Sequence, residues 1–172
     1  MKVILWVFVT LAGLLILITL IGWLLPKDHV VSREGRYKQS PEAIWQAITD
    51  VDAMPSWREG LNTVKHLPDQ NGMPGHIEIT SSGEIPMQTE EMLPPKKLVE
   101  RIADPKLPFG GTWTFEITPT AEGANLRITE RGWVSNPLFR FLSRFVFGHT
   151  STIESYLKSL AKKFGERPQI GE

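Results

Sequence analysis

The stretch SNPLFRFLSRFVFGHTSTIESYLKSLAKKFGE, residues 135–166, decides the fold because it predicts one long amphipathic helix near the carboxy-terminal end of the chain. Ser135 or Asn136 can cap this helix, Pro137 suits its first turn, and Gly165 marks its end. Apolar residues recur in steps of three and four, the spacing of a single helix face: Leu138, Leu142, Phe145, Ile153, Tyr156, Leu160 and Phe164. We therefore expect this face to pack against the rest of the domain.

His149 is the exception on that apolar face, because it stands one step after Phe145 and one step before Ile153. A histidine there could hold the polar group of a ligand, or act as a general acid or base near neutral pH. It could equally hydrogen-bond to a neighbouring strand, or lie in a joint if the helix breaks at Gly148. The sequence leaves these interpretations open.

The preceding residues alternate between strand patterns and turn signals. His29–Gln39 is a candidate first strand. SPEAIWQAITD, residues 40–50, predicts a short helix with Ser40 as its N-cap and Pro41 at its first position, and Pro55 breaks a second helical turn. Six further strands are predicted, at Leu61–Leu67, Gly75–Ser82, Ile85–Leu93, Lys97–Ala103, Thr112–Thr118 and Ala124–Val134.

This order of elements predicts an α+β domain in which a curved antiparallel sheet of about seven strands wraps around the long carboxy-terminal helix. The segments SPEAIWQAITDVDAMPSW, PPKKLV, GGTWTFEITP and NPLFRFLSRFVFGHT resemble the polyketide cyclase/dehydrase-type branch of the START-like (SRPBCC, birch-pollen-allergen-like) superfamily, across nearly all of residues 29–165. The resemblance implies a helix-grip fold with a cavity between the sheet and the last helix. Relatives use such a cavity for lipids, sterols, quinones and other apolar molecules, and some cyclise or dehydrate polyketides there.

The amino-terminal residues 1–26 are expected to form a single-pass transmembrane anchor, and residues 27–172 a START-like ligand-binding domain. No charged residue occurs from Val3 to Leu25, and a membrane-spanning helix needs about 20 apolar residues. A cleaved signal peptide is the alternative, but this run exceeds the usual ~7–15 apolar residues and lacks a small-residue cleavage site. Only Lys2 precedes the apolar run, whereas four basic residues follow it: Lys27, Arg33, Arg36 and Lys38. Because basic residues are enriched on the cytoplasmic side of a span, this favours a cytoplasmic domain.

Composition excludes several classes of protein. The formal net charge is zero and no basic run occurs, so no nucleic-acid partner is expected. With no cysteine there is no disulfide or thiolate metal site, and His29, His66 and His76 lack the spacing of a metal motif. No phosphate-binding loop, nucleophile elbow or dinucleotide fingerprint is present, so we expect neither a metal nor a cofactor. The oligomeric state is not predicted.

Glu130 is the second polar residue in an apolar setting, because Leu126 and Ile128 share its face of a strand. A carboxylate turned toward a cavity needs a partner or a raised pKa, and His149 or Arg101 could supply the partner. The alternative is that Glu130 lies at a solvated rim and pairs with Arg127 or Arg131. The sequence does not decide between these positions.

The first half of the predicted helix carries four phenylalanines, Phe139, Phe141, Phe145 and Phe147, with Arg140 and Arg144 between them. One interpretation is an interfacial helix whose rings enter the headgroup zone of a membrane while its arginines meet phosphates. The other is a helix packed on two sides, against the sheet and the small helices. Both stay open.

The leading hypothesis is a membrane-anchored module that binds a hydrophobic small molecule, such as a lipid, isoprenoid or quinone, in an internal cavity. The alternatives are a cyclase- or dehydratase-type enzyme that uses Glu130 and His149 as an acid/base pair, and a scaffold with a filled core. The residues expected to line the cavity are Trp57, Ile77, Ile79, Met87, Trp113, Phe115, Leu126, Ile128, Phe145, Ile153 and Tyr156, with Glu130 and His149 as the polar exceptions.

Overall fold

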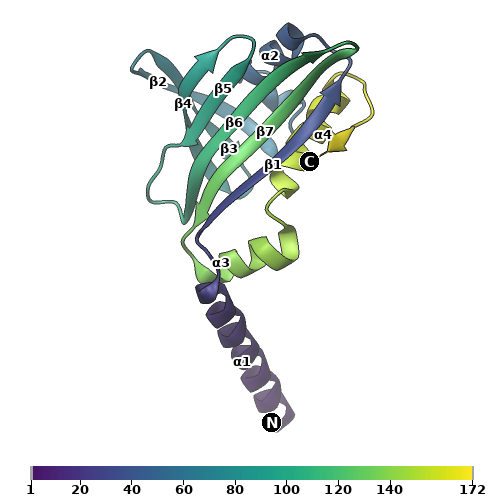
Figure 1. The fold of residues 1–172 in the computed structure, drawn as a ribbon. Coiled ribbons are helices and arrows are strands. Elements are labelled where there is room, and N and C mark those ends of the chain that lie inside the picture. Colours follow the sequence, from purple (N-terminus) through teal and green to yellow (C-terminus); the bar gives the residue numbers. More distant parts are fainter. Residues whose placement is uncertain (1, 172) are drawn as a thin grey trace.

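The computed structural model describes residues 2–171. A curved sheet forms most of the domain, and a single helix projects away from one end of it (Figure 1). The helices are α1 (Lys2–Leu24), α2 (Pro41–Thr49), the 3₁₀ turn η1 (Met54–Ser56), α3 (Pro137–Leu142), the π-helical turn η2 (Ser143–Phe147) and α4 (Ser151–Lys163). The strands are β1 (Asp28–Tyr37), β2 (Leu61–Gln70), β3 (Met73–Thr80), β4 (Gly83–Leu93), β5 (Lys97–Ile102), β6 (Phe109–Thr120), β7 (Gly123–Val134) and β8 (Ile170–Gly171).

The sheet has eight strands in the order β2-β3-β4-β5-β6-β7-β1-β8, and each strand pairs antiparallel with the strands beside it. This confirms the predicted α+β helix-grip fold. The prediction of about seven strands missed β8, whose two residues pair with Glu34 and Gly35 of β1. A two-residue strand is too short to show an alternating pattern.

The core lies between the sheet and α2 and α4. Its fully buried members come from all three elements, with Ile44 on α2, Leu126 and Ile128 on β7, and Ile153 and Leu160 on α4, each 0% exposed. The start of α2 follows its prediction, since the Ser40 hydroxyl accepts a hydrogen bond from the Ala43 backbone N–H and Pro41 occupies the first turn.

The prediction of one continuous carboxy-terminal helix is wrong, and the open alternative of a break at Gly148 is confirmed. The chain is helical in α3 and η2, turns at Gly148 with a φ of 76°, and begins α4 at Ser151. A positive φ is accessible to glycine at little cost, so Gly148 redirects the chain. Only the second half of the apolar ladder reaches the sheet, and Phe145 in the first half is 60% exposed.

Among the described helices, α1 alone is long and apolar enough to cross a membrane. None of the residues in its most apolar stretch is buried against the rest of the protein. Its last turn contacts α3, which lies across that end (Figure 1). Gly22 makes the close approach possible, because a Cβ there would stand 1.9 Å from the Pro137 carbonyl oxygen. Arg140 adds a hydrogen bond from its Nη1 to the Leu25 carbonyl at 2.9 Å.

Candidate functional site: a cavity beside the helix break

A cavity of about 760 Å³ lies where the chain breaks between η2 and α4. It is bounded by the β3–β4 turn, the β5–β6 loop, the first residues of β6, the end of β7 and the helical segments that flank Gly148. Its apolar walls include Ile85, Ile102, Leu107, Phe109, Trp133, Val134, Phe139 and Phe147, and its polar members include His29, Glu130, Ser143, His149, Ser151 and Thr152. A mostly apolar hollow with a few clustered polar groups is typical of a small-molecule site.

The main polar feature of this cavity is a trio formed by His29, Glu130 and His149. His29 Nε2 lies 3.4 Å from Glu130 Oε1. The imidazole rings of His29 and His149 stack with centroids 4.3 Å apart and 23° between their planes. Gly132 faces His29 across the β1–β7 pair and makes room for its ring, since a Cβ on Gly132 would lie 2.7 Å from that ring.

The environment of the trio favours its uncharged forms. Burial raises the pKa of Glu130 to about 7. Burial also lowers the pKa of His29, against an opposing effect of Asp28. The pKa of His149 is lowered by burial and further by His29 and Arg144. At neutral pH the two imidazoles are therefore mostly uncharged and Glu130 is about half protonated, so the trio offers both hydrogen-bond donors and acceptors.

Two of the predicted site residues line this cavity, Glu130 and His149, and their link runs through His29. Among the described residues, His29 rather than His149 or Arg101 is the hydrogen-bond partner of Glu130. Arg101 instead pairs with Glu90. The sequence analysis missed His29 because it set that residue aside with the scattered histidines, and only the pairing of β1 with β7 in the structure brings His29 beside Glu130.

Most of the apolar residues predicted to line the cavity lie in the packed core instead. Leu126, Ile128 and Ile153 are fully buried. The others in or against this core are Phe115, Tyr156, Trp57 and Trp113, while Met87 is buried on β4 beside Ile102. The helix α4 packs directly against the sheet in this core. The cavity therefore lies beside Gly148, where the chain leaves that contact. Phe145 also lies outside the lining.

The prediction that Ile77 and Ile79 of β3 face the interior is wrong, because the opposite face of this strand is buried. His76 and Glu78 are 3% and 5% exposed, whereas Ile77 and Ile79 are only partly buried and lie on the opposite face of the strand. The rule that apolar residues face inward failed because the two polar residues find partners inside the domain. Ile77 and Ile79 therefore do not face the interior.

Those partners form a second, buried charged cluster. Arg58, which follows η1, pairs with Glu78, and His76 lies 3.6 Å from Glu78 and 3.9 Å from Glu100. Burial raises the pKa of Glu100 to about 7. The guanidinium of Arg58 also stands 5.0 Å from the centre of the Tyr156 ring. This cluster ties the region after η1 to the sheet and α4, and sequence reasoning did not find it.

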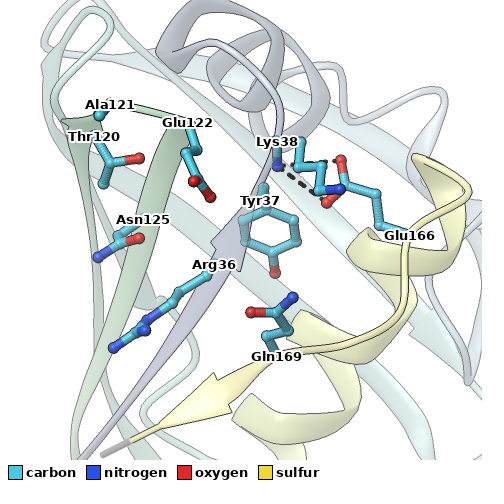
Figure 2. Close-up of a pocket in the computed structure, with 9 residues that line it drawn as sticks. All are labelled: Arg36, Tyr37, Lys38, Thr120, Ala121, Glu122, Asn125, Glu166 and Gln169. Atoms are coloured by element: carbon cyan, nitrogen blue, oxygen red, sulfur yellow. Dashed lines mark hydrogen bonds between the residues drawn. The ribbon is translucent and has the colours of Figure 1, made fainter.

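A polar hollow of about 370 Å³ lies beside the β6–β7 turn, where the end of β1 meets the segment that follows α4. Figure 2 shows its lining, in which the Lys38 backbone N–H donates to the Glu166 carboxylate. The other residues that line this hollow are Arg36, Tyr37, Thr120, Ala121, Glu122, Asn125 and Gln169. Because most of these side chains are charged or polar, the hollow does not suit an apolar ligand. Within residues 2–171, no group of three or more His, Asp or Glu side chains could hold a metal ion.

The match to known families follows the domain boundaries seen in the structure. The model of the polyketide cyclase/dehydrase and lipid transport family matches residues 29–165, from the start of β1 to just after α4. The chain belongs to this family. This membership supports a ligand-binding or cyclase-type module, and the matched residues 29–165 contain the whole trio. No match was found among curated proteins.

Solved structures agree on the fold of this polyketide cyclase/dehydrase and lipid transport domain. A START superfamily protein from Mycobacterium smegmatis is 18% identical, with a TM-score of 0.64 and coverage of 78% of this chain and 96% of the other. A solution structure from Thermobifida fusca is 19% identical, with a TM-score of 0.60 and coverage of 81% and 94%. The di-domain ARO/CYC StfQ from the steffimycin biosynthetic pathway is 16% identical, with a TM-score of 0.57 and coverage of 81% and 52%.

Proposed function

We propose that this protein is a membrane-anchored module that binds a hydrophobic small molecule in the cavity beside the helix break. The observation that carries the proposal is the cavity itself, about 760 Å³ of mostly apolar space with one polar cluster in its wall. Ligand sites of this kind commonly measure about 300–1,000 Å³. A scaffold with a filled core, the alternative without a ligand, does not account for such a space.

The side chains of the trio suit a ligand with an uncharged polar group, such as the hydroxyl of an isoprenoid alcohol or the carbonyl of a quinone. A charged head group that enters an apolar cavity needs a counter-ion or loses much of its solvation free energy. His29 and His149 are mostly uncharged near pH 7 and Glu130 is about half protonated, because burial disfavours their charged forms. They can still donate to and accept from a neutral oxygen atom.

The proposed anchor is α1, and its contacts with the domain favour a retained helix over a cleaved signal peptide. Gly22 packs against Pro137, and Arg140 is 5% exposed while it donates to the Leu25 carbonyl. Removal of the helix would leave the Arg140 side chain without this acceptor. The basic residues that follow α1 support a domain on the cytoplasmic side.

The test is to identify what the full chain carries from a membrane. Wild-type protein is extracted in polymer-bounded lipid discs, and the organic extract is compared by mass spectrometry with that of Thr152→Trp, which places a large ring in the cavity wall from an exposed position on α4. Lys162→Trp, exposed on the same helix and outside the cavity lining, is the control. We expect an apolar species in wild type and control that Thr152→Trp loses. Identical extracts from all three would count against the proposal.

A cyclase- or dehydratase-type enzyme is the second candidate, and the contact between Glu130 and His29 favours it. A carboxyl group with a pKa of about 7 beside an imidazole is suited to proton transfer at neutral pH. If the protein is an enzyme, the extracted species should be converted to a new product by wild type and not by Glu130→Gln. If it is a carrier, the species is recovered unchanged from both.

A further inference from the structure

An exposed apolar surface lies on the segment formed by α3 and η2, residues 137–147. Its exposed members are Phe139 (51%), Phe145 (60%), Val146 (59%) and Phe147 (64%). Within residues 25–171, the other large apolar side chains exposed to this degree are Val30 and Leu93. Single exposed apolar residues are ordinary in proteins, but a run of three with a fourth nearby indicates a surface that something covers.

This segment is held at the end of α1. Arg140 donates from Nη1 to the Leu25 carbonyl at 2.9 Å and from Nη2 to the Ser135 carbonyl at 3.1 Å. Gly22 and Pro137 meet so closely that no side chain fits between them. Since α1 projects away from the domain and α3 lies across its end (Figure 1), the segment stands where the apolar run stops. In a chain that α1 anchors, this place is the surface of the bilayer.

The same segment forms one wall of the cavity. Phe139, Ser143 and Phe147 line it, and their spacing of four residues places them on one side of the helical segment. Phe139 and Phe147 are also more than half exposed, so they stand at the rim between the cavity and the outside. Phe145 and Val146 are exposed and do not line the cavity. The wall of the site and the exposed apolar surface are therefore parts of one element.

We propose that the α3–η2 segment lies in the boundary between the headgroups and acyl chains of the bilayer that α1 spans, and that the rim at Phe139 and Phe147 opens the cavity toward the lipid. A ligand then passes between the membrane and the cavity without crossing water. The inference rests on the proposed function for α1 as the anchor. Two observations favour the bilayer as the covering partner: the surface continues directly from the end of α1, and it is rich in phenylalanine, which favours that boundary.

The first test measures where the segment lies. Because the chain has no cysteine, single cysteines introduced by Phe145→Cys, Leu14→Cys and Lys158→Cys can each carry one nitrobenzoxadiazole fluorophore. Leu14 is in the middle of α1, and Lys158 is exposed on α4. The full chain is placed in phosphatidylcholine nanodiscs. Quenching by lipids with a doxyl group near the top or near the end of the acyl chain is compared with quenching by iodide in the water.

We expect lipid quenching at residues 14 and 145 and iodide quenching at residue 158. Lipid quenching at residue 14 with iodide quenching at residue 145 would overturn the inference and leave the anchor standing. Iodide quenching at residue 14 would overturn the anchor itself. Protection of residue 145 from both quenchers would also overturn the inference, because a protein partner or a second copy would then cover the segment.

The second test concerns passage of the ligand. A pyrene-labelled fatty alcohol is dissolved in the same nanodisc, and its entry is followed by energy transfer from Trp133, which lines the cavity, with Trp133→Phe subtracted as background. The double variant Phe145→Ser/Val146→Ser leaves the cavity lining intact and should slow loading by about fivefold or more, because it weakens insertion of the segment. Lys158→Ser/Lys162→Ser should load like wild type. Equal loading rates in all three proteins would overturn the proposed route.

Discussion

The imidazole ring of His29 stacks on that of His149 with 4.3 Å between ring centroids, which joins the start of β1 to the break between η2 and α4. His29 also contacts the Glu130 carboxyl on β7 at 3.4 Å. Three elements far apart in the sequence thus bring one titratable side chain each to the wall of the same cavity. The first two predictions concern this trio.

Replacement of His29 should weaken ligand binding without unfolding the domain. We expect His29→Ala to reduce the affinity for a long-chain alcohol by about 2- to 10-fold, the equivalent of one neutral hydrogen bond. Binding is measured in nanodiscs by quenching of Trp133 with a brominated fatty alcohol. His66→Ala is the control, because His66 is exposed and pairs with Asp52 away from the cavity. An equal loss in both variants would show that the trio does not contact the ligand.

Replacement of Glu130 should stabilise the protein at high pH and have little effect at low pH. The folded state raises the pKa of this carboxyl from 4.5 to about 7, so the folded state binds its proton more tightly than the unfolded chain does. The resulting penalty is absent below about pH 4.5, grows up to about pH 7, and is complete above it. Glu130→Gln should therefore gain roughly 1–3 kcal/mol at pH 8. Thermal unfolding from pH 4.5 to 8 measures this difference.

Glu84→Gln is the control for that series, since Glu84 is exposed at the start of β4. Glu100→Gln should show the same sign as Glu130→Gln, because burial also raises the pKa of Glu100 to about 7. A Glu130→Gln variant that is less stable than wild type at pH 8 would mean that the carboxylate is well solvated or paired in the folded state.

The buried pair of Arg58 and Glu78 should matter far more for stability than a surface pair. Arg58→Ala leaves the Glu78 carboxylate, 6% exposed, without its guanidinium partner, and we expect a loss of about 3–5 kcal/mol. Lys65→Ala breaks the exposed pair with Glu84 and should cost less than about 1 kcal/mol. Denaturant unfolding of the full chain compares the two. Similar small losses would indicate that water reaches Glu78.

The contact between α1 and α3 depends on the absence of a side chain at Gly22. Gly22→Leu should leave membrane association intact but separate α1 from α3, so that trypsin cleaves faster after Lys27. Gly13→Leu is the matched control, because a Cβ at Gly13 meets nothing within 4 Å. Limited proteolysis in nanodiscs gives the two cleavage rates. Equal rates would mean that α1 does not rest on α3 in the membrane.

If α1 is the membrane anchor proposed above, one introduced cysteine shows on which side of the membrane the domain lies. Glu122→Cys, at the exposed turn between β6 and β7, should react with a membrane-impermeant maleimide only after the cells are opened, if the domain is cytoplasmic. The wild-type chain has no cysteine and serves as the blank. Labelling in intact cells would place the domain on the opposite side.

Much of the fold could be predicted because its signals are local. Ser40 and Pro41 mark the start of α2, and the alternation in β6 and β7 marks strands that are buried on one face. The site was only partly predictable. Glu130 and His149 stood out as polar residues in apolar patterns, while His29 became recognisable only once β1 was paired with β7.

The sequence alone determined most of the order of the elements and the long apolar run at the amino-terminal end, because periodicity, capping and composition are properties of neighbouring residues. The family was recognised from the resemblance of whole segments to a known superfamily. Only the tertiary structure decided that β3 turns His76 and Glu78 inward and that the carboxy-terminal helix breaks at Gly148. The physical reason is the same in both cases. Which face is buried, and where a helix can leave the sheet, depends on partners such as Arg58 and α1 that lie far away in the chain.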